Sequence, residues 1–250
     1  MYRSLNIESI ISTVNRIERR VSERFPASGL YGVCTELRMV VSEAEVHCEH
    51  LNRPNWWVRG IAGFLVALIL VMLITSLMAV EWTHEIFQVG QFFEATEALV
   101  SEIVVIGAGI FFLITLESRL KRKKALAQLH EFRALAHVID MHQLTKDPDR
   151  LVRREGRNTE SSPATVMDSF ALERYLDYCS EMLSIVGKTA ALYAQNLNDP
   201  VVLSAVTEIE QLTAMLSNKV WQKITNIAIH PDARRRLRKE RIRLAQQDAQ

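Results

Sequence analysis

Positive charge is missing from one long part of the chain, because no lysine or arginine lies between Arg59 and Arg119. Two apolar runs occupy that part. The first is IAGFLVALILVMLITSLMAV, residues 61–80, and the second covers residues 98–116. A bilayer core of about 30 Å needs about 20 apolar residues in a helix. Both runs reach that length, which predicts a two-pass membrane protein.

The charges around these runs predict its orientation. The segment between the runs and the start of the second run carry acidic residues: Glu81, Glu85, Glu94, Glu97 and Glu102. Basic residues flank the runs on their other sides: Arg53, Arg59, Arg119, Lys121, Arg122, Lys123 and Lys124. By the positive-inside rule, both termini are expected to be cytoplasmic and the short acidic loop external. Trp56, Trp57 and Trp82 then lie where indole rings favour the two membrane interfaces.

Cysteine is also scarce. Cys34, Cys48 and Cys179 all fall on the predicted cytoplasmic side, so we expect reduced thiols and no disulfide framework. The first residues alternate charged with apolar positions and lack the continuous apolar core of a cleavable signal peptide.

Helix breakers are absent over a long stretch, since no proline or glycine lies between Ile110 and Pro148. The second transmembrane helix is therefore expected to continue into the cytoplasm to about Leu144. No strand pattern is convincing, and the predicted class is all-α, a transmembrane hairpin joined to a cytoplasmic helical bundle. The predicted parts are N-terminal amphipathic helices (1–55), transmembrane helix 1 (56–81), an external loop (82–97), transmembrane helix 2 (98–117), its extension (118–144), a linker (145–163), a helical hairpin (164–229) and a basic tail (230–250).

Apolar residues at helical spacing predict the core of the cytoplasmic part. In residues 4–24 they are Ile7, Ile10, Ile11, Val14, Ile17 and Val21, and in residues 30–52 they are Leu30, Val33, Leu37, Val41 and Ala44. The hairpin is expected to start at Pro163 with Ser162 as its cap and to turn at Asp199-Pro200. Its stripes include Phe170 and Trp221.

Catalytic motifs are missing. No Gly-x-Ser-x-Gly or His-Glu-x-x-His is present, and Gly187-Lys188-Thr189 lacks the upstream glycine and the strand of a phosphate loop. We therefore expect neither enzymatic activity nor a cofactor.

A polar stripe follows the second apolar run at positions that share one helix face: His130, Arg133, His137 and Asp140. The simplest interpretation is a solvated face with local salt bridges. The interpretation that we favour over catalysis is contact with other copies or with the hairpin, whose Glu173, Asp177 and Glu181 lie at four-residue spacing.

Metal binding is the alternative interpretation of the same region. His137, Asp140 and His142 have suitable donor atoms, but a fourth ligand is lacking. His47 and His50 form a second cluster with the same weakness. The basic tail, with seven arginines and lysines from Arg234 to Arg243, favours a membrane surface or an acidic partner, and nucleic acid is not expected because no interleaved aromatic residues accompany it.

The segments HVIDMHQLTKDP, LERYLDYCSEML and KVWQKI resemble a group of uncharacterised bacterial two-transmembrane inner-membrane proteins. The plan of a membrane hairpin with flanking cytoplasmic helices is also similar to the SLATT-type membrane effectors of bacterial conflict systems. That resemblance implies oligomerisation into pores and covers about the first half of the chain.

The sequence supports three hypotheses of function. The first is a non-enzymatic membrane protein that forms homo-oligomers and senses or docks a cytoplasmic protein partner through its helices, with a pore as one outcome of assembly. The second is a membrane-tethered metal-dependent enzyme that uses His137, Asp140 and His142. The third is a membrane anchor or adaptor for a soluble partner.

Overall fold

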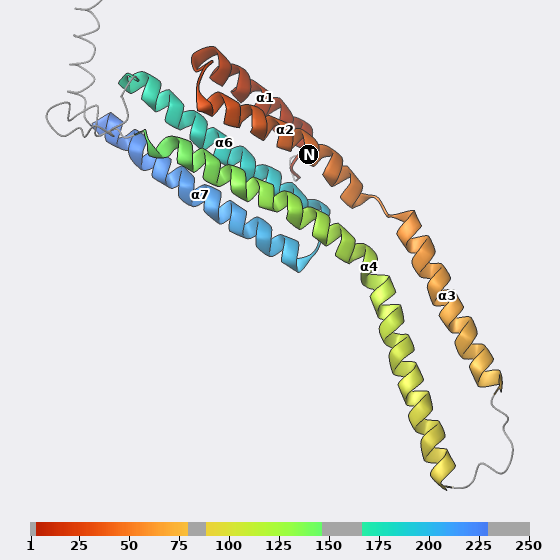
Figure 1. Cartoon of the computed structure of the whole chain (residues 1–250). Coiled ribbons are helices and arrows are strands. Elements are labelled where there is room, and N and C mark those ends of the chain that lie inside the picture. The colour runs from red at the N-terminus through yellow and green to blue at the C-terminus, as the bar shows by residue number, and fades with distance from the viewer. Residues whose placement is uncertain (1–3, 80–88, 147–166, 230–250) are drawn as a thin grey trace, which may run out of the picture. The chain divides into compact units, whose positions relative to one another are not determined.

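The computed structural model describes residues 4–79, 89–146 and 167–229, and these residues form helices and no strand (Figure 1). The helices are α1 (Ile7–Arg24), α2 (Gly29–Asn52), α3 (Trp56–Ala79), α4 (Val89–Leu144), α6 (Ser169–Asn196) and α7 (Pro200–Ile229). The all-α prediction, with two long apolar helices and a helical bundle, is confirmed.

The chain divides into two compact units. The first unit, which we call the bundle, holds residues up to His50 and from Ala125 onward. The second, which we call the apolar unit, holds Leu51–Lys124. Helix α4 contributes its first part to the apolar unit and its last part to the bundle.

The core of the bundle comes from the stripes predicted by helical spacing. Helix α1 buries Ile10, Val14, Ile17 and Val21, and α2 buries all five of its predicted residues. Helix α4 adds a buried face on the side opposite the polar stripe, which includes Leu129, Phe132, Leu135, Ala136 and Ile139. Burying one such large side chain stabilises the fold by about 1.5–3 kcal/mol, so these stripes hold the bundle together.

Helices α6 and α7 pack closely at one glycine. A Cβ atom added at Gly187 would lie 2.9 Å from Thr213 Oγ1. The neighbouring Thr189 hydroxyl is fully buried and donates to the Ile185 carbonyl within its own helix. The sequence Gly187-Lys188-Thr189 lies inside the continuous helix α6, whereas a phosphate loop would need a loop between a strand and a helix there.

Side-chain caps fix where several helices begin. Asn6 accepts from the Glu8 amide before α1, and Asp199 accepts from the Val201 and Val202 amides at the start of α7. Such a cap satisfies amides that have no partner inside the helix. Helix α7 starts at Pro200, as predicted, because proline tolerates the first helical position.

One predicted boundary is wrong. Helix α4 begins at Val89, so the second half of the predicted external loop, 82–97, is already helical. Helix α6 begins at Ser169, where Asp168 caps it by accepting from the Ala171 amide at 2.7 Å. The predicted start of the hairpin at Ser162 and Pro163 lies outside the described residues.

Two aromatic residues expected in the core are exposed. Phe170 is 55% exposed, and the guanidinium groups of Arg24 and Arg174 lie over its ring. Trp221 on α7 is 58% exposed. Both residues border the buried stripes of their helices, where spacing alone does not decide burial.

The apolar unit contains two helices long and apolar enough to cross a membrane. Their most apolar windows are not buried against any part of the described chain. Trp56 and Trp57, at the start of α3, are also highly exposed. Trp82 and the basic tail, 230–250, lie outside the described residues, as does nearly all of the linker.

Replacing Gly187 by leucine is expected to destabilise the bundle, because the new side chain must displace Thr213 from a close helix contact. Overpacking of this kind costs about 1–3 kcal/mol. Thermal unfolding followed by circular dichroism measures it in the detergent-solubilised protein. The matched control is Gly32→Leu, since nothing lies within 4 Å of a Cβ added there. Equal unfolding midpoints for the two variants would contradict the packing.

Candidate functional site

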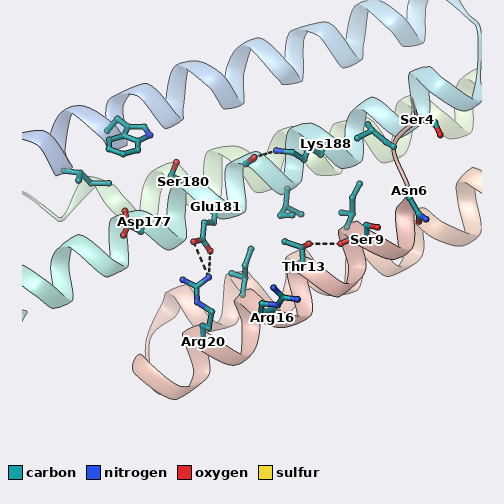
Figure 2. A pocket seen from close by; sticks show the side chains of 17 residues that line it. Ser4, Asn6, Ser9, Thr13, Arg16, Arg20, Asp177, Ser180, Glu181 and Lys188 are labelled. Atoms are coloured by element: carbon teal, nitrogen blue, oxygen red, sulfur yellow. Dashed lines mark hydrogen bonds and ion pairs between the residues drawn. The ribbon is translucent and has the colours of Figure 1, made fainter. Parts of the chain in front are cut away.

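A groove of about 980 Å³ runs along the bundle between α1 and α6, with α7 at its edge (Figure 2). Helix α1 and the residues just before it supply one wall, and α6 supplies the other. Trp221 and Ile224 of α7 also line it. The groove lies within the bundle alone, so its shape depends on the packing described above.

An ion pair connects the two walls. Arg20 Nη1 donates to both carboxylate oxygens of Glu181, at 3.3 and 3.1 Å. The Arg20 guanidinium also lies 5.0 Å from the centre of the Tyr178 ring. Both charged side chains of the pair are more than a third exposed, so the pair orients the walls more than it stabilises the fold.

Hydrogen bonds between the chain before α1 and α6 fix the wall near its other end. The Leu5 amide donates to Gln195 Oε1 at 2.9 Å, and Gln195 Nε2 donates back to the Leu5 carbonyl at 3.3 Å. Together with the Arg20–Glu181 pair, these bonds hold α1 along α6 in an antiparallel register. The groove is therefore a fixed feature of the bundle.

The charges that line the groove are not balanced. Both of its carboxylates have basic partners, Asp177 with Arg174 and Glu181 with Arg20. Lys188 Nζ donates to the Ser184 hydroxyl, and no carboxylate of the described residues pairs with it. Arg16 has no hydrogen-bond or ion-pair partner among the described residues. The groove thus presents two uncompensated positive charges.

Hydroxyl groups and one indole complete the lining. Ser9, Thr13, Ser180 and Ser184 face the groove. The Thr13 hydroxyl donates to the Ser9 carbonyl at 2.7 Å, so its own helix satisfies it. The exposed Trp221 ring offers a large apolar surface with a polar edge, a combination found at protein–protein interfaces. This lining suits a helix that carries both acidic and apolar residues.

The polar stripe on α4 is largely solvent-exposed. His130, Arg133 and His137 are exposed, and Asp140 is half-buried and accepts from Gln143 Nε2. Arg133 pairs with Glu208 of α7 at 3.1 Å. The four stripe residues lie on one continuous helix, and the ion-pair partners of Asp177 and Glu181 are Arg174 and Arg20.

The metal alternative gains no support from the geometry. His137 is exposed, and the His142 ring is half-buried against Gly29, where an added Cβ would lie 2.5 Å from it. Among the described residues, no three His, Cys, Asp or Glu side chains come together as a metal site.

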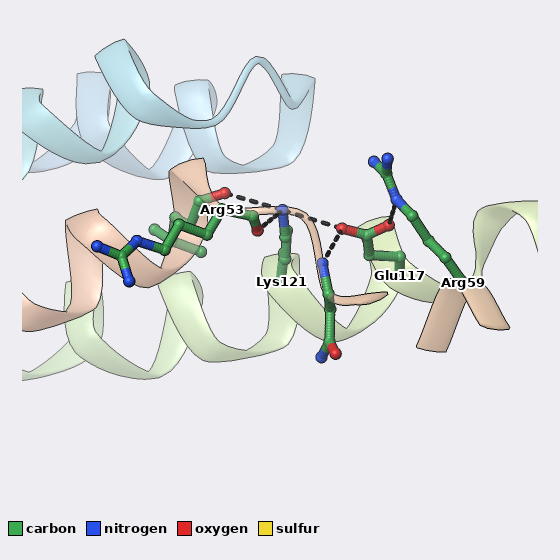
Figure 3. A network of polar contacts seen from close by, with 6 residues as sticks. Arg53, Arg59, Glu117 and Lys121 are labelled. Carbon is green, nitrogen blue, oxygen red and sulfur yellow. Dashed lines mark hydrogen bonds and ion pairs between the residues drawn. The ribbon is translucent and has the colours of Figure 1, made fainter. Parts of the chain in front are cut away.

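A second polar cluster, which we call the Glu117 clamp, lies in the apolar unit (Figure 3). Glu117 accepts from Arg59 Nε at 2.6 Å, from the Asn55 amide at 3.1 Å and from Lys121 Nζ at 3.1 Å. Lys121 also donates to the Leu51 and Arg53 carbonyls, both at 2.9 Å. The clamp therefore joins the turn before α3 to α4 through one carboxylate and one ammonium.

The basic residues that predict topology differ in their contacts and exposure. Arg59 and Lys121 belong to the Glu117 clamp, and the Arg119 guanidinium lies over the Phe112 ring at 5.3 Å. Lys123 and Lys124 are exposed, and Arg122 is half-buried.

Sequence patterns did not single out Glu117 or the groove. Glu117 is a lone acidic residue between the apolar Leu116 and a basic cluster, and that position is a usable signal for an ion pair. The groove depends on which helices become neighbours, and no local pattern reports that.

No protein-family model, curated protein or solved structure matches this chain. The similarity in plan to SLATT-type membrane effectors stays a prediction.

Removal of the Glu117 carboxylate is expected to loosen the turn before α3. In Glu117→Gln the Asn55 amide and the Arg59 and Lys121 side chains lose their charged acceptor, and a hydrogen bond to a charged group contributes about 1.5–3 kcal/mol. We expect hydrogen–deuterium exchange at residues 53–57 to be about tenfold faster or more. Glu97→Gln, at an exposed position of α4, is the control. Unchanged exchange would mean that the clamp does not hold the turn.

The bundle thiols are expected to be unreactive in the folded protein. Burial raises the pKa of Cys34 and of Cys179 to about 12, and it also raises the pKa of Cys48. At pH 8 the first two then hold about a thousandfold less thiolate than an ordinary thiol, and the thiolate is the reactive form. Maleimide labelling should modify an added Glu45→Cys thiol rapidly and the three natural thiols only after unfolding. Rapid native labelling would show that the core opens.

Proposed function

We propose that this chain is a two-pass membrane protein that self-associates and uses its helical bundle to dock a protein partner in the groove. The observation that carries the membrane assignment is the uncovered apolar surface of α3 and α4. Trp57 is 84% exposed and Met78 is 81% exposed. In water each such side chain would forgo about 1.5–3 kcal/mol of transfer free energy, whereas lipid covers it at no such cost.

The charges at the ends of these helices support the cytoplasmic side for the bundle. Basic residues gather beside the Glu117 clamp and extend to Lys124, while Glu97, toward the other end of the apolar part of α4, is acidic. The positive-inside rule places such a basic cluster in the cytoplasm. The bundle, with its groove, then lies at the cytoplasmic surface of a bacterial inner membrane.

Docking is supported by the lining of the groove. Arg16 and Lys188 lack carboxylate partners among the described residues, and Trp221 is exposed beside them. A partner helix with acidic and apolar side chains would neutralise the first two and cover the third. Two spans cannot enclose a pore, so a conducting role requires several copies arranged around one axis.

Membrane insertion is tested with single cysteines in sealed vesicles. The Phe64→Cys thiol, on an exposed position of α3, should resist a membrane-impermeant maleimide because lipid surrounds it. The Glu45→Cys thiol, on the surface of α2, should react only when the cytoplasmic face is accessible. The buried natural thiols give little background. Equal labelling of both sites, or release of the chain by alkaline carbonate, would overturn the membrane assignment.

Self-association is tested by light scattering of the detergent-solubilised protein, with the detergent mass subtracted. We expect several copies in each particle, because the groove and the apolar helices both remain uncovered in a single copy. Five or more copies would make a central pathway geometrically feasible and would justify ion-flux assays in liposomes. A monomer would contradict self-association and leave a different protein as the docked partner.

A further inference from the structure

The surface of α2 opposite the core carries a regular stripe of exposed residues. Its members are Gly32, Glu36, Met39, Glu43, Val46 and His50, spaced alternately by four and three residues. We call this set the α2 stripe. Met39 is 41% exposed and Val46 is 53% exposed. Residues at this spacing form one continuous face of a helix, so two apolar side chains alternate with two carboxylates along the outside of the bundle.

The α2 stripe and the groove have opposite uncompensated charges. Glu36 and Glu43 have no hydrogen-bond or ion-pair partner within the part of the chain that the structure describes. The groove has Arg16 and Lys188, which lack carboxylate partners there. Each surface also exposes apolar side chains, Met39 and Val46 on one and Trp221 on the other.

The two surfaces lie at the same level along the bundle. Glu18 of α1 pairs with Arg38 of α2 at 2.9 Å, and α2 runs antiparallel to α1 after a short turn (Figure 1). Arg16, two residues before Glu18, is therefore level with Val40, two residues after Arg38. Val40 lies between Glu36 and Glu43.

The other unpaired cation of the groove gives the same result. Arg20 pairs with Glu181, and α6 runs antiparallel to α1, so Lys188 is level with Thr13. Thr13 is five residues before Glu18 and so is level with Glu43, five residues after Arg38. At 1.5 Å per residue, Arg16 lies about 4.5 Å along the axis from Lys188.

We propose that the groove of one copy receives the α2 stripe of a second copy of this chain. The inference rests on the proposed docking role of the groove and names its occupant. The matched levels let two copies meet side by side with parallel bundles. The contact joins two different surfaces, so each copy retains a free groove on one side and a free stripe on the other. Such contacts repeat and form a ring when the rotation closes.

Reversal of charge on each surface tests this pairing in the full-length protein. The stripe variant is Glu36→Lys with Glu43→Lys, and the groove variant is Arg16→Glu with Lys188→Glu. Each alone places like charges across the contact and should weaken self-association by about tenfold or more, measured as particle mass against protein concentration. All four positions are exposed, so circular dichroism should show an unchanged fold.

Mixing the stripe variant with the groove variant tests whether the two surfaces contact each other. In the mixture, every contact between a stripe variant and a groove variant is complementary, so assembly should return with copies in alternation. The matched controls are Glu45→Lys on α2 and Arg19→Glu on α1, which are exposed but lie outside the stripe and the groove lining. Both should self-associate like the unaltered protein.

Three outcomes would overturn the proposal. A monomeric unaltered protein would exclude a second copy as the occupant. Loss of assembly in the groove variant alone, with the stripe variant unaffected, would leave the groove as a docking site but give it another occupant. Weakening in both variants without recovery in the mixture would show that the two surfaces do not contact each other. The membrane assignment is tested separately by the labelling experiment, so its failure is distinguishable.

Discussion

The apolar surface of α3 and of the first part of α4 is the constraint on which the rest of the structure depends. Because no part of the described chain covers these side chains, the bundle cannot use them for its own stability. The bundle instead closes a core of its own from α1, α2, α6, α7 and the last part of α4, with residues such as Leu37, Phe132 and Tyr193 fully buried. The chain thus separates a unit whose long apolar helices stay uncovered from a bundle with a buried core of its own.

The Glu117 clamp lies in the apolar unit, where the chain passes from α2 into α3. A carboxylate beside apolar side chains needs hydrogen-bond donors that water does not fully supply, and Glu117 receives them from Arg59, Lys121 and the Asn55 amide. Lys121 in turn donates to the Leu51 carbonyl at the end of α2 and to the Arg53 carbonyl in the turn that follows, where Pro54 donates no amide hydrogen bond. The cluster therefore supplies hydrogen-bond partners to backbone groups between α2 and α3, and it fixes the turn from which α3 begins.

The sequence allowed most of the helices and their buried faces to be predicted, because spacing and capping act locally. The stripes of α1 and α2, the end of α4 at Leu144 and the start of α7 at Pro200 all follow from such signals. The start of α4 was missed because residues 89–97 contain good helix formers that also suit a loop on a membrane. The groove was missed for a different reason: Arg16, Lys188 and Trp221 come from three helices, and only their packing brings them together.

The groove contains two carboxylates, Asp177 and Glu181, as well as its cations. Its uncompensated positive charge therefore depends on which of these residues form ion pairs with one another. Arg174 and Arg20 neutralise those carboxylates, so the charges of Arg16 and Lys188 remain available to a partner. Ion pairs between exposed side chains contribute about 1 kcal/mol or less each. In the proposed contact, affinity therefore comes mainly from the exposed apolar side chains of Met39, Val46 and Trp221, and the charges determine which surfaces meet. If the copies also share one membrane, as proposed, their common orientation and high effective concentration strengthen the same contact.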